Sequence, residues 1–476
     1  MQPYQVLLLI AAYFGVLVFI SYLTGKGGSN SEFFRANKQA PWYLVAFGMI
    51  GASLSGVTFI SIPGTVESDN FSYFQVVLGY TIGYAVIGQV LLPLYYRMNL
   101  TSIYTYLGDR FGIASYKTGA SFFLLSRVVG SSFRLFLVAN VLQLIVFDSM
   151  GVPYYVTVSI TILLIWLYTF KSGIKTIVWT DTLQTFFMLL ALGITIYFIS
   201  KDLQISNIFN YLSESNYSRV FFFDDWRSKD HFVKQFLSGA FIAIVMTGLD
   251  QDMMQKNLTC RTLKDAQKNM FWFTIVLVVA NLCFLTLGVL LTDYADVNGI
   301  TETKDDLFPA IAMSGKLGLG VAIFFLLGLI AAAYSSADSA LTALTTSFSI
   351  DILEIDKKYS EEKQVRIRKR IHILFSLVLI VVMLIFNYAI ADKSVINKLF
   401  QFAGYTYGPL LGLYAFGLFT QWKVRDALVP VIALAAPILS YFISINSLQW
   451  FGFEFGFFIL ILNGLLTFLG LVLARR

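Results

Sequence analysis

The stretch Gly48-Met-Ile-Gly51-Ala-Ser53-Leu54-Ser55-Gly56-Val-Thr58 lies inside an apolar run, residues 42–65, that is long enough to cross a membrane. Its glycines and serines disfavour a continuous helix, and Pro63 follows them. A break in a membrane helix frees backbone carbonyls, which survive at membrane depth only where they line a cavity or coordinate a ligand. The alternative is a seam of small residues at which two helices pack closely. Spacing alone leaves both interpretations open.

The composition around this stretch is typical of an integral membrane protein. The chain has 476 residues, of which 57% are hydrophobic and 13% charged, whereas soluble domains have roughly 45–50% and about 25%. So few charges cannot cover a water-facing surface, which argues against a soluble enzyme or a nucleic-acid binder. Cys260 and Cys283 are too few for a disulfide framework, and the separated His231 and His372 do not form a zinc motif.

Thirteen apolar runs are close to the length of about 20 residues that a transmembrane helix needs. They lie near residues 4–24, 42–65, 73–97, 119–147, 152–170, 176–200, 233–255, 269–292, 317–350, 371–391, 396–420, 425–444 and 451–474. We expect an all-α integral membrane protein of about 13 transmembrane helices, forming one domain over 1–476. The first run has no preceding basic segment and no Ala-x-Ala site, so we expect a retained helix and not a signal peptide.

Lysine and arginine alternate from loop to loop. They follow every odd-numbered run up to the eleventh: Lys26, Arg35, Lys38, Arg97, Arg110, Lys117, Lys171, Lys175, Lys256, Arg261, Lys264, Lys268, the cluster 357–370, Lys423 and Arg425. The intervening loops are neutral or acidic. The positive-inside rule then predicts an external N-terminus and a cytoplasmic C-terminus. It also explains the net charge of +6 without a nucleic-acid partner. A solvated loop is favoured for 357–370 over a specific lipid site.

Ionisable residues inside membrane spans are costly and are functional candidates by default. Six occur here: Arg127, Arg134, Asp181, Asp250, Asp252 and Asp338. Asp338 belongs to a second polar stretch, Ala332-Ala-Tyr334-Ser335-Ser336-Ala-Asp338-Ser339. Positions 332, 335, 336 and 339 share one helical face. Their oxygens suit a hard cation, although the serines could instead bond to carbonyls of their own helix.

These stretches resemble the sodium:solute symporter family, which includes sodium–galactose, proline and sialic-acid symporters. The matching motifs are Ser55-Gly-Val-Thr58-Phe-Ile-Ser-Ile-Pro63, Val178-Trp-Thr-Asp181-Thr-Leu-Gln184, Ala331-Ala-Ala-Tyr-Ser335-Ser336-Ala-Asp338-Ser339-Ala-Leu and Gly404-Tyr-Thr-Tyr-Gly408-Pro409. The motif likeness is closest to the bacterial sialic-acid branch. The resemblance implies a leucine-transporter-type fold of two inverted five-helix repeats, 42–200 and 233–420. Three extra helices then occupy 4–24 and 425–474.

The resemblance also implies a main sodium site. Its ligands would be the carbonyls of Gly51, Leu54 and Ala332 and the hydroxyls of Ser335 and Ser336. A possible second sodium site would use Asp181, Asp338 and Ser339; Asp338 stands where the sialic-acid symporter has a serine, and a purely structural hydrogen bond is its alternative role. Two sodium ions per anionic solute would make uptake electrogenic.

Residues beside the break align with substrate-contacting positions of the sialic-acid symporter. They are Ser53, Ser55 and Thr58, with Arg134 as a carboxylate-binding arginine if an insertion of about one turn is accepted; a structural ion pair is its alternative. For Arg127 the structural ion pair is favoured. Ala243 and Met246 replace sugar-binding residues of the galactose symporters, which disfavours a plain aldose.

The predicted protein is therefore not an enzyme but a sodium-coupled secondary active symporter working by alternating access. It would import a small polar organic solute, for which a carboxylate such as a sialic acid is one candidate. Proton coupling through Asp181 and Asp338 is the alternative, and a channel or receptor is a third. The predicted partners are the solute, Na⁺ and the lipid bilayer of a plasma (bacterial inner) membrane. No cofactor, nucleic acid or obligate protein partner is expected.

Overall fold

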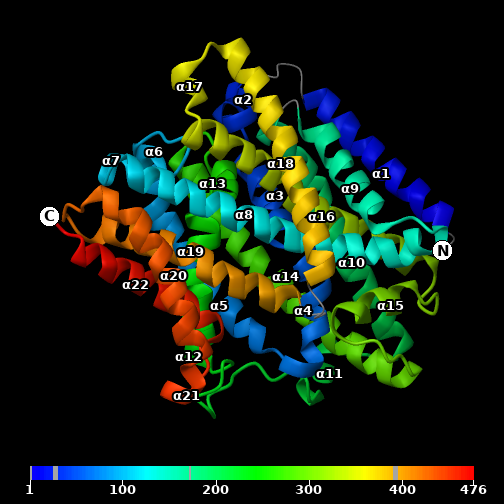
Figure 1. The fold of residues 1–476 in the computed structure, drawn as a ribbon. Coiled ribbons are helices and arrows are strands. Elements are labelled where there is room, and N and C mark those ends of the chain that lie inside the picture. Colours follow the sequence, from blue (N-terminus) through cyan, green and yellow to red (C-terminus); the bar gives the residue numbers. More distant parts are fainter. Residues whose placement is uncertain (1–2, 25–29, 171–172, 390–394) are drawn as a thin grey trace.

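Apolar helices make up the body of the protein (Figure 1). The structure is a computed structural model that describes residues 3–24, 30–170, 173–389 and 395–476. Over these ranges the β-type pairings are two isolated bridges, Ala40 with Cys260 and Val424 with Arg475. The all-α prediction is confirmed. Lys26, Lys171 and the end of the predicted run 371–391 lie outside the described residues.

Nine described helical segments are long and apolar enough to cross a membrane, and two bent pairs bring the number to 11. The segments are Tyr4–Thr24, Ser72–Arg97, Ile113–Met150, Ile174–Asp202, Leu263–Asn298, Leu319–Ile352, Glu361–Tyr388, Asp426–Ile445 and Gly456–Leu473. In order, they contain helices α1 (Pro3–Thr24), α5 (Ser72–Val86), α8 (Ile113–Leu142), α10 (Ile174–Asp202), α14 (Leu263–Asn298), α16 (Leu319–Ser347), α18 (Glu361–Ala389), α20 (Val429–Ile445) and α22 (Ile459–Leu473). The two remaining predicted runs coincide with the shorter α9 (Tyr154–Thr169) and with α19 (Val395–Phe419). Thirteen crossings therefore stay a prediction.

Two spans are broken. Helices α3 (Trp42–Ser53) and α4 (Gly56–Asp69) meet at 54°, which places the break inside the stretch that the sequence singled out. Helices α12 (Phe232–Ala243), continued by a π-turn to Gly248, and α13 (Gln251–Asn257) meet at 69°. Each bent pair opens one of the two predicted five-helix halves, as an inverted repeat requires.

Helix α16 (Leu319–Ser347) lies at the centre, and every residue from Phe325 to Ser347 is buried. It packs against α10 (Ile174–Asp202) and α8 (Ile113–Leu142), and α10 also packs against α3. Elsewhere α5 (Ser72–Val86) crosses α12 at Gly79 and Gly239, where an added Cβ would collide with the opposite backbone. Such small-residue crossings are typical of helix packing in membranes.

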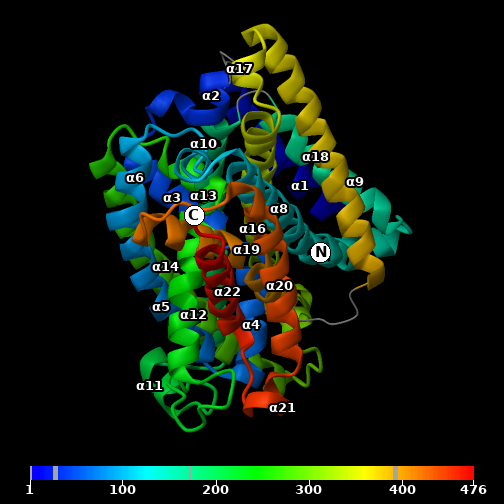
Figure 2. The ribbon, with the colours of Figure 1, turned by 60° about the vertical axis from the view of Figure 1, so that its left-hand side comes forward.

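The two ends of the bundle differ in charge. Helices α2 (Asn30–Arg35) and α17 (Ile355–Lys358) lie at one end, and α11 (Ile208–Glu214) and α21 (Ser447–Phe451) at the other (Figure 2). At the first end the basic loops meet: Arg35 donates to the Asn99 carbonyl over 3.1 Å, and Lys117 pairs with Glu354 over 2.5 Å. This is the end that the positive-inside rule assigns to the cytoplasm.

Candidate functional site

The break between α3 and α4 faces the middle of α16. The Ser336 hydroxyl lies 3.5 Å from the Ala52 carbonyl, and a Cβ on Gly51 would lie 3.2 Å from the Ser335 hydroxyl. Leu54 is at the break itself, and Ala332 lies one turn before Ser336 on α16. The structure therefore brings the break and the α16 residues of the predicted main sodium site together.

The backbone at the break releases carbonyls from the helical ladder. Leu54 ends α3 with a ψ of 76°, and Ser55 is extended with a ψ of 179°. The Ser55 amide consequently donates to the Ser53 carbonyl 3.0 Å away, and not to Gly51, its partner in a regular helix. A carbonyl that has lost its helical partner inside a membrane needs another one. A cation in the break would supply it.

The two α16 serines are engaged by charged side chains from two other helices. Ser335 donates to Asp181 Oδ1 on α10 over 2.8 Å, whereas Ser336 accepts a hydrogen bond of 2.9 Å from Arg134 Nη1 on α8. The alternative, in which a serine bonds to a carbonyl of its own helix, applies to Ser339: its hydroxyl donates to the Ser335 carbonyl over 2.8 Å. Both hydroxyls of the predicted sodium site are thus hydrogen-bonded to charged side chains.

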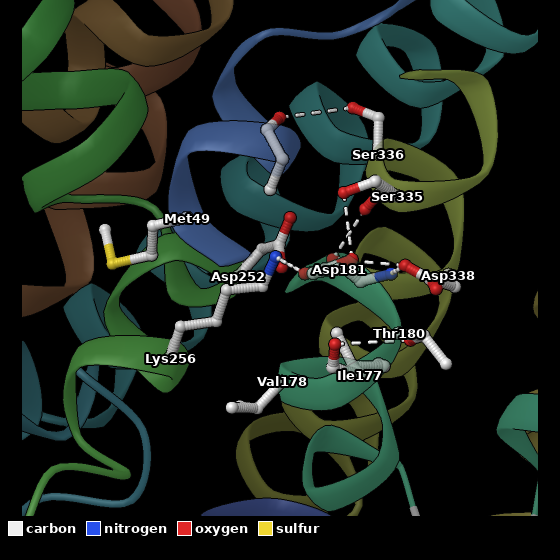
Figure 3. Close-up of polar contacts among 12 residues, drawn as sticks. Met49, Ile177, Val178, Thr180, Asp181, Asp252, Lys256, Ser335, Ser336 and Asp338 are labelled. Carbon is white, nitrogen blue, oxygen red and sulfur yellow. Dashed lines mark hydrogen bonds and ion pairs between the residues drawn. The ribbon is translucent and has the colours of Figure 1, made fainter. Parts of the chain in front are cut away.

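Asp181 forms a buried ion pair that the sequence did not suggest. Lys256 Nζ lies 2.6 Å from Asp181 Oδ2, and the two residues are 1% and 0% exposed (Figure 3). The prediction that Lys256 belongs to the basic loop after the seventh run is wrong, because Lys256 lies in the short helix α13, which follows the 69° bend and is buried. The available signal was Asp181 itself: a carboxylate inside a span needs a cation or a proton.

Asp338 is also fully buried and is held by neutral donors. Tyr168 on α9 donates to Oδ2 over 2.9 Å, and the Ser339 amide donates to Oδ1 over 2.5 Å. The hydrogen bond from Tyr168 fits the alternative role of Asp338, which is a purely structural hydrogen bond. The possible second sodium site, formed by Asp181, Asp338 and Ser339, stays a prediction. Its two carboxylates are linked by hydrogen bonds through Ser335, which donates to Asp181, and Ser339, which contacts both the Ser335 carbonyl and Asp338.

A cavity with an empty volume of about 680 Å³, part of it open to solvent, lies beside the break. All four predicted substrate residues line it: Ser53, Ser55, Thr58 and Arg134. The rest of the polar lining includes Tyr73, Tyr80, Tyr84, Thr247 and Asn281, and Ala243 and Met246 add apolar surface.

The two arginines of α8 have different surroundings, although both line this cavity. Arg127 is 4% exposed and forms ion pairs with Asp252 and, over 3.7 Å, with Asp250. Arg134 has no carboxylate within ion-pair distance in the described parts of the chain, and its buried Nε has no hydrogen-bond partner there. The structural ion pair therefore fits Arg127 and not Arg134.

A model of the sodium:solute symporter family matches residues 33–427. The sodium/sialic acid symporter of Aliivibrio fischeri is 25% identical over 444 residues, which are 90% of this chain and 86% of that protein. Sodium-coupled monocarboxylate transporter 2 of Bos taurus is also 25% identical, over 91% of this chain and 70% of that protein.

Solved structures show the same fold. A substrate-bound, outward-open sodium-coupled sialic acid symporter superposes with a TM-score of 0.82 at 19% identity, covering 100% of this chain and 98% of that one. Mhp1, a nucleobase-cation-symport-1 family transporter in a closed conformation, superposes with a TM-score of 0.56 over 93% of this chain and 94% of that one. The fold is of the predicted leucine-transporter type, and the chain belongs to the sodium:solute symporter family.

Proposed function

We propose that this protein imports a small organic carboxylate together with sodium by alternating access. The carrying observation is Arg134, a guanidinium on the wall of a polar cavity with no carboxylate within ion-pair distance among the residues that the structure describes. A partly buried charge without a counterion is unfavourable, and a planar guanidinium matches a carboxylate with two parallel hydrogen bonds. The sialic acid and monocarboxylate transporters among the relatives carry solutes of this chemistry.

Arg134 also suggests how solute and sodium are coupled. Its Nη1 donates to Ser336, one of the proposed sodium ligands. A solute carboxylate would draw the guanidinium into the cavity, and the Ser336 hydroxyl would then turn its lone pairs to sodium. Each ligand would thereby favour the binding of the other, which is the reciprocal coupling that symport requires.

The finer assignments follow from this proposal. The N-terminus would be external and the C-terminus cytoplasmic, in a bacterial inner membrane. Residues 42–200 and 233–420 would form the two moving halves, with 4–24 and 425–474 as additional helices. Sodium and the solute would be the ligands, with no cofactor and no obligate protein partner.

The direct test is uptake by the purified protein in proteoliposomes. The solutes would be labelled sialic acids, monocarboxylates, amino acids and sugars, with sodium or with choline outside at constant pH. We expect one acidic solute to accumulate against its gradient only with sodium. Accumulation that follows a proton gradient and ignores sodium would favour the alternative of a proton symporter. Flux that never exceeds equilibration would indicate a channel.

Ser336→Ala is expected to lower the apparent sodium affinity roughly ten- to a hundredfold, because a hydrogen-bond-scale contact to a charge is worth about 1.5–3 kcal/mol. The measurement is the sodium concentration that gives half-maximal uptake. The matched control is Thr195→Val on α10, whose buried hydroxyl donates to the Ala191 carbonyl of its own helix over 2.8 Å. Superimposable sodium curves for Ser336→Ala and the wild type would place the site elsewhere.

A further inference from the structure

Lys256 brings a positive charge into the centre of the transporter. It lies on α13, all of whose residues are buried. Its ammonium reaches across to Asp181 on α10, with 2.6 Å between Nζ and Oδ2 (Figure 3). Burying a lysine is tolerated only where a carboxylate and further hydrogen bonds compensate the lost hydration. Ionisable residues buried at membrane depth are functional candidates by default.

The partner of this ammonium, Asp181, is one of the three residues that the sequence analysis assigned to a second sodium ion, together with Asp338 and Ser339. Asp181 Oδ1 accepts from Ser335, and Oδ2 faces Lys256. The Ser339 hydroxyl donates to the Ser335 carbonyl over 2.8 Å and lies 3.3 Å from Asp338 Oδ1. The hydrogen-bonded set of Asp181, Asp338, Ser335 and Ser339 therefore already holds one cation. That cation is the ammonium of Lys256, a side chain of the protein itself.

We propose that Lys256 is a tethered cation that takes the place of a second sodium ion at Asp181. The inference rests on the proposed sodium-coupled function and limits its stoichiometry to one sodium ion per solute, bound between the α3–α4 break and α16. It replaces the expectation of two sodium ions. The physical reason is that a free ion on Asp181 would have to displace the ammonium or share a carboxylate with it, at a cost from like-charge repulsion in a poorly screened site.

The stoichiometry follows from this arrangement. With one sodium ion, import of a monovalent anion moves no net charge, so the membrane potential does not drive it. Removal of the tethered charge would leave Asp181, together with Asp338 and Ser339, able to bind a sodium ion. The chain would then carry two sodium ions per solute, and import of the same anion would become electrogenic.

The experiment measures the ratio of ²²Na⁺ flux to solute flux in proteoliposomes at several clamped potentials. The wild type is expected to give a ratio of one, independent of potential for a monovalent anion. Lys256→Arg keeps the charge and should also give one. Lys256→Met should raise the ratio toward two, with the sodium Hill coefficient rising from one toward two. The double variant Lys256→Met with Asp181→Asn removes both the ammonium and the carboxylate that would bind a second sodium ion. It should therefore return the ratio to one.

Each outcome decides between the alternatives. A wild-type ratio of two would overturn the tethered cation while leaving sodium symport intact, whereas sodium-independent uptake would overturn the proposed function itself. A Lys256→Met protein that transports well at a ratio of one would also refute the proposal. If Lys256→Met does not fold, Lys256→Gln replaces it, since its amide can still donate to Asp181 without carrying charge.

Discussion

Arg134→Ala is expected to abolish most uptake of a carboxylate solute, and Arg134→Lys to do nearly the same. Loss of one partner of a buried charge pair costs about 2–5 kcal/mol, which is roughly thirty- to several-thousandfold in kcat/KM. Lysine keeps the charge but not the planar fork, so it cannot make two parallel hydrogen bonds to a carboxylate. It also cannot contact the solute and Ser336 with the same geometry, which would impair the coupling to sodium.

The readout is initial uptake of the best acidic solute and of its neutral amide or ester, at saturating sodium. Both variants should lose discrimination between acid and neutral analogue, while the wild type should favour the acid. Rescue by lysine to wild-type rates would mean that Arg134 supplies only a positive charge. Equal uptake of both analogues by all three proteins would remove Arg134 from the solute site.

Local sequence predicted the parts of the fold that depend on local chemistry. Hydrophobic runs of sufficient length have one stable arrangement in lipid, a helix, and each predicted run coincides with a helix or a bent pair. The break at Ser53–Gly56 was also recognisable, because glycine and serine weaken a helix at that point. The α16 face followed from its 3.6-residue spacing.

The parts that sequence reasoning missed depend on contacts between distant segments. The second break carries no comparable marker: it follows Gly248, and the Asp250 side chain caps α13 by accepting from the amides of Asp252 and Met253. Without this break Lys256 would extend toward the cytoplasm, as the charge pattern suggested. Its partner Asp181 lies 75 positions earlier in the sequence, and only the packing of α13 beside α10 brings the two charges together.

Arg134 illustrates the same limit within one helix. Its alignment with a carboxylate-binding position needed an insertion of one turn, and Arg127, seven residues earlier, was an equally charged candidate. Only the arrangement of neighbouring helices separates them, since Arg127 pairs with Asp252 of α13 and with Asp250, the residue that caps this helix. Arg134 is left without a carboxylate partner among the described residues, which is why we propose it as the solute-binding arginine.

The ion pairs of Arg127 close the cavity on the side of the basic loops. Asp252, Asp250 and Arg127 are all at most 4% exposed, and Tyr407 on α19 donates to Asp250 over 2.5 Å. The opposite side leads to a second, open pocket that shares Tyr73 with the cavity and is lined by Asp69 and Asp230 of the acidic loops. A buried cluster that joins α8, α13 and α19 therefore lies beside the cavity, and we expect it to act as the inner gate.

Asp252→Asn is expected to shift the protein strongly toward the inward-open state. Removing one partner of a buried ion pair costs about 3–5 kcal/mol, which is roughly a hundred- to several-thousandfold in the conformational equilibrium. Asp250 still faces Arg127, so the shift should lie at the lower end of that range. Sodium-driven accumulation should fall, while exchange of internal for external solute should persist. Asp252→Glu, which keeps the charge, is the matched control and should retain accumulation.

The shift can be measured with a cysteine introduced by Ala243→Cys on the cavity wall, modified by a membrane-impermeant thiol reagent from either side. Cys283 would be replaced by alanine. Burial raises the pKa of Cys260 to about 12, so little thiolate forms there at neutral pH and its background should be small. The wild type should react from outside, and Asp252→Asn mainly from the cytoplasmic side. Equal labelling of wild type and Asp252→Asn from both sides would show that the Arg127 cluster does not hold the inner gate shut.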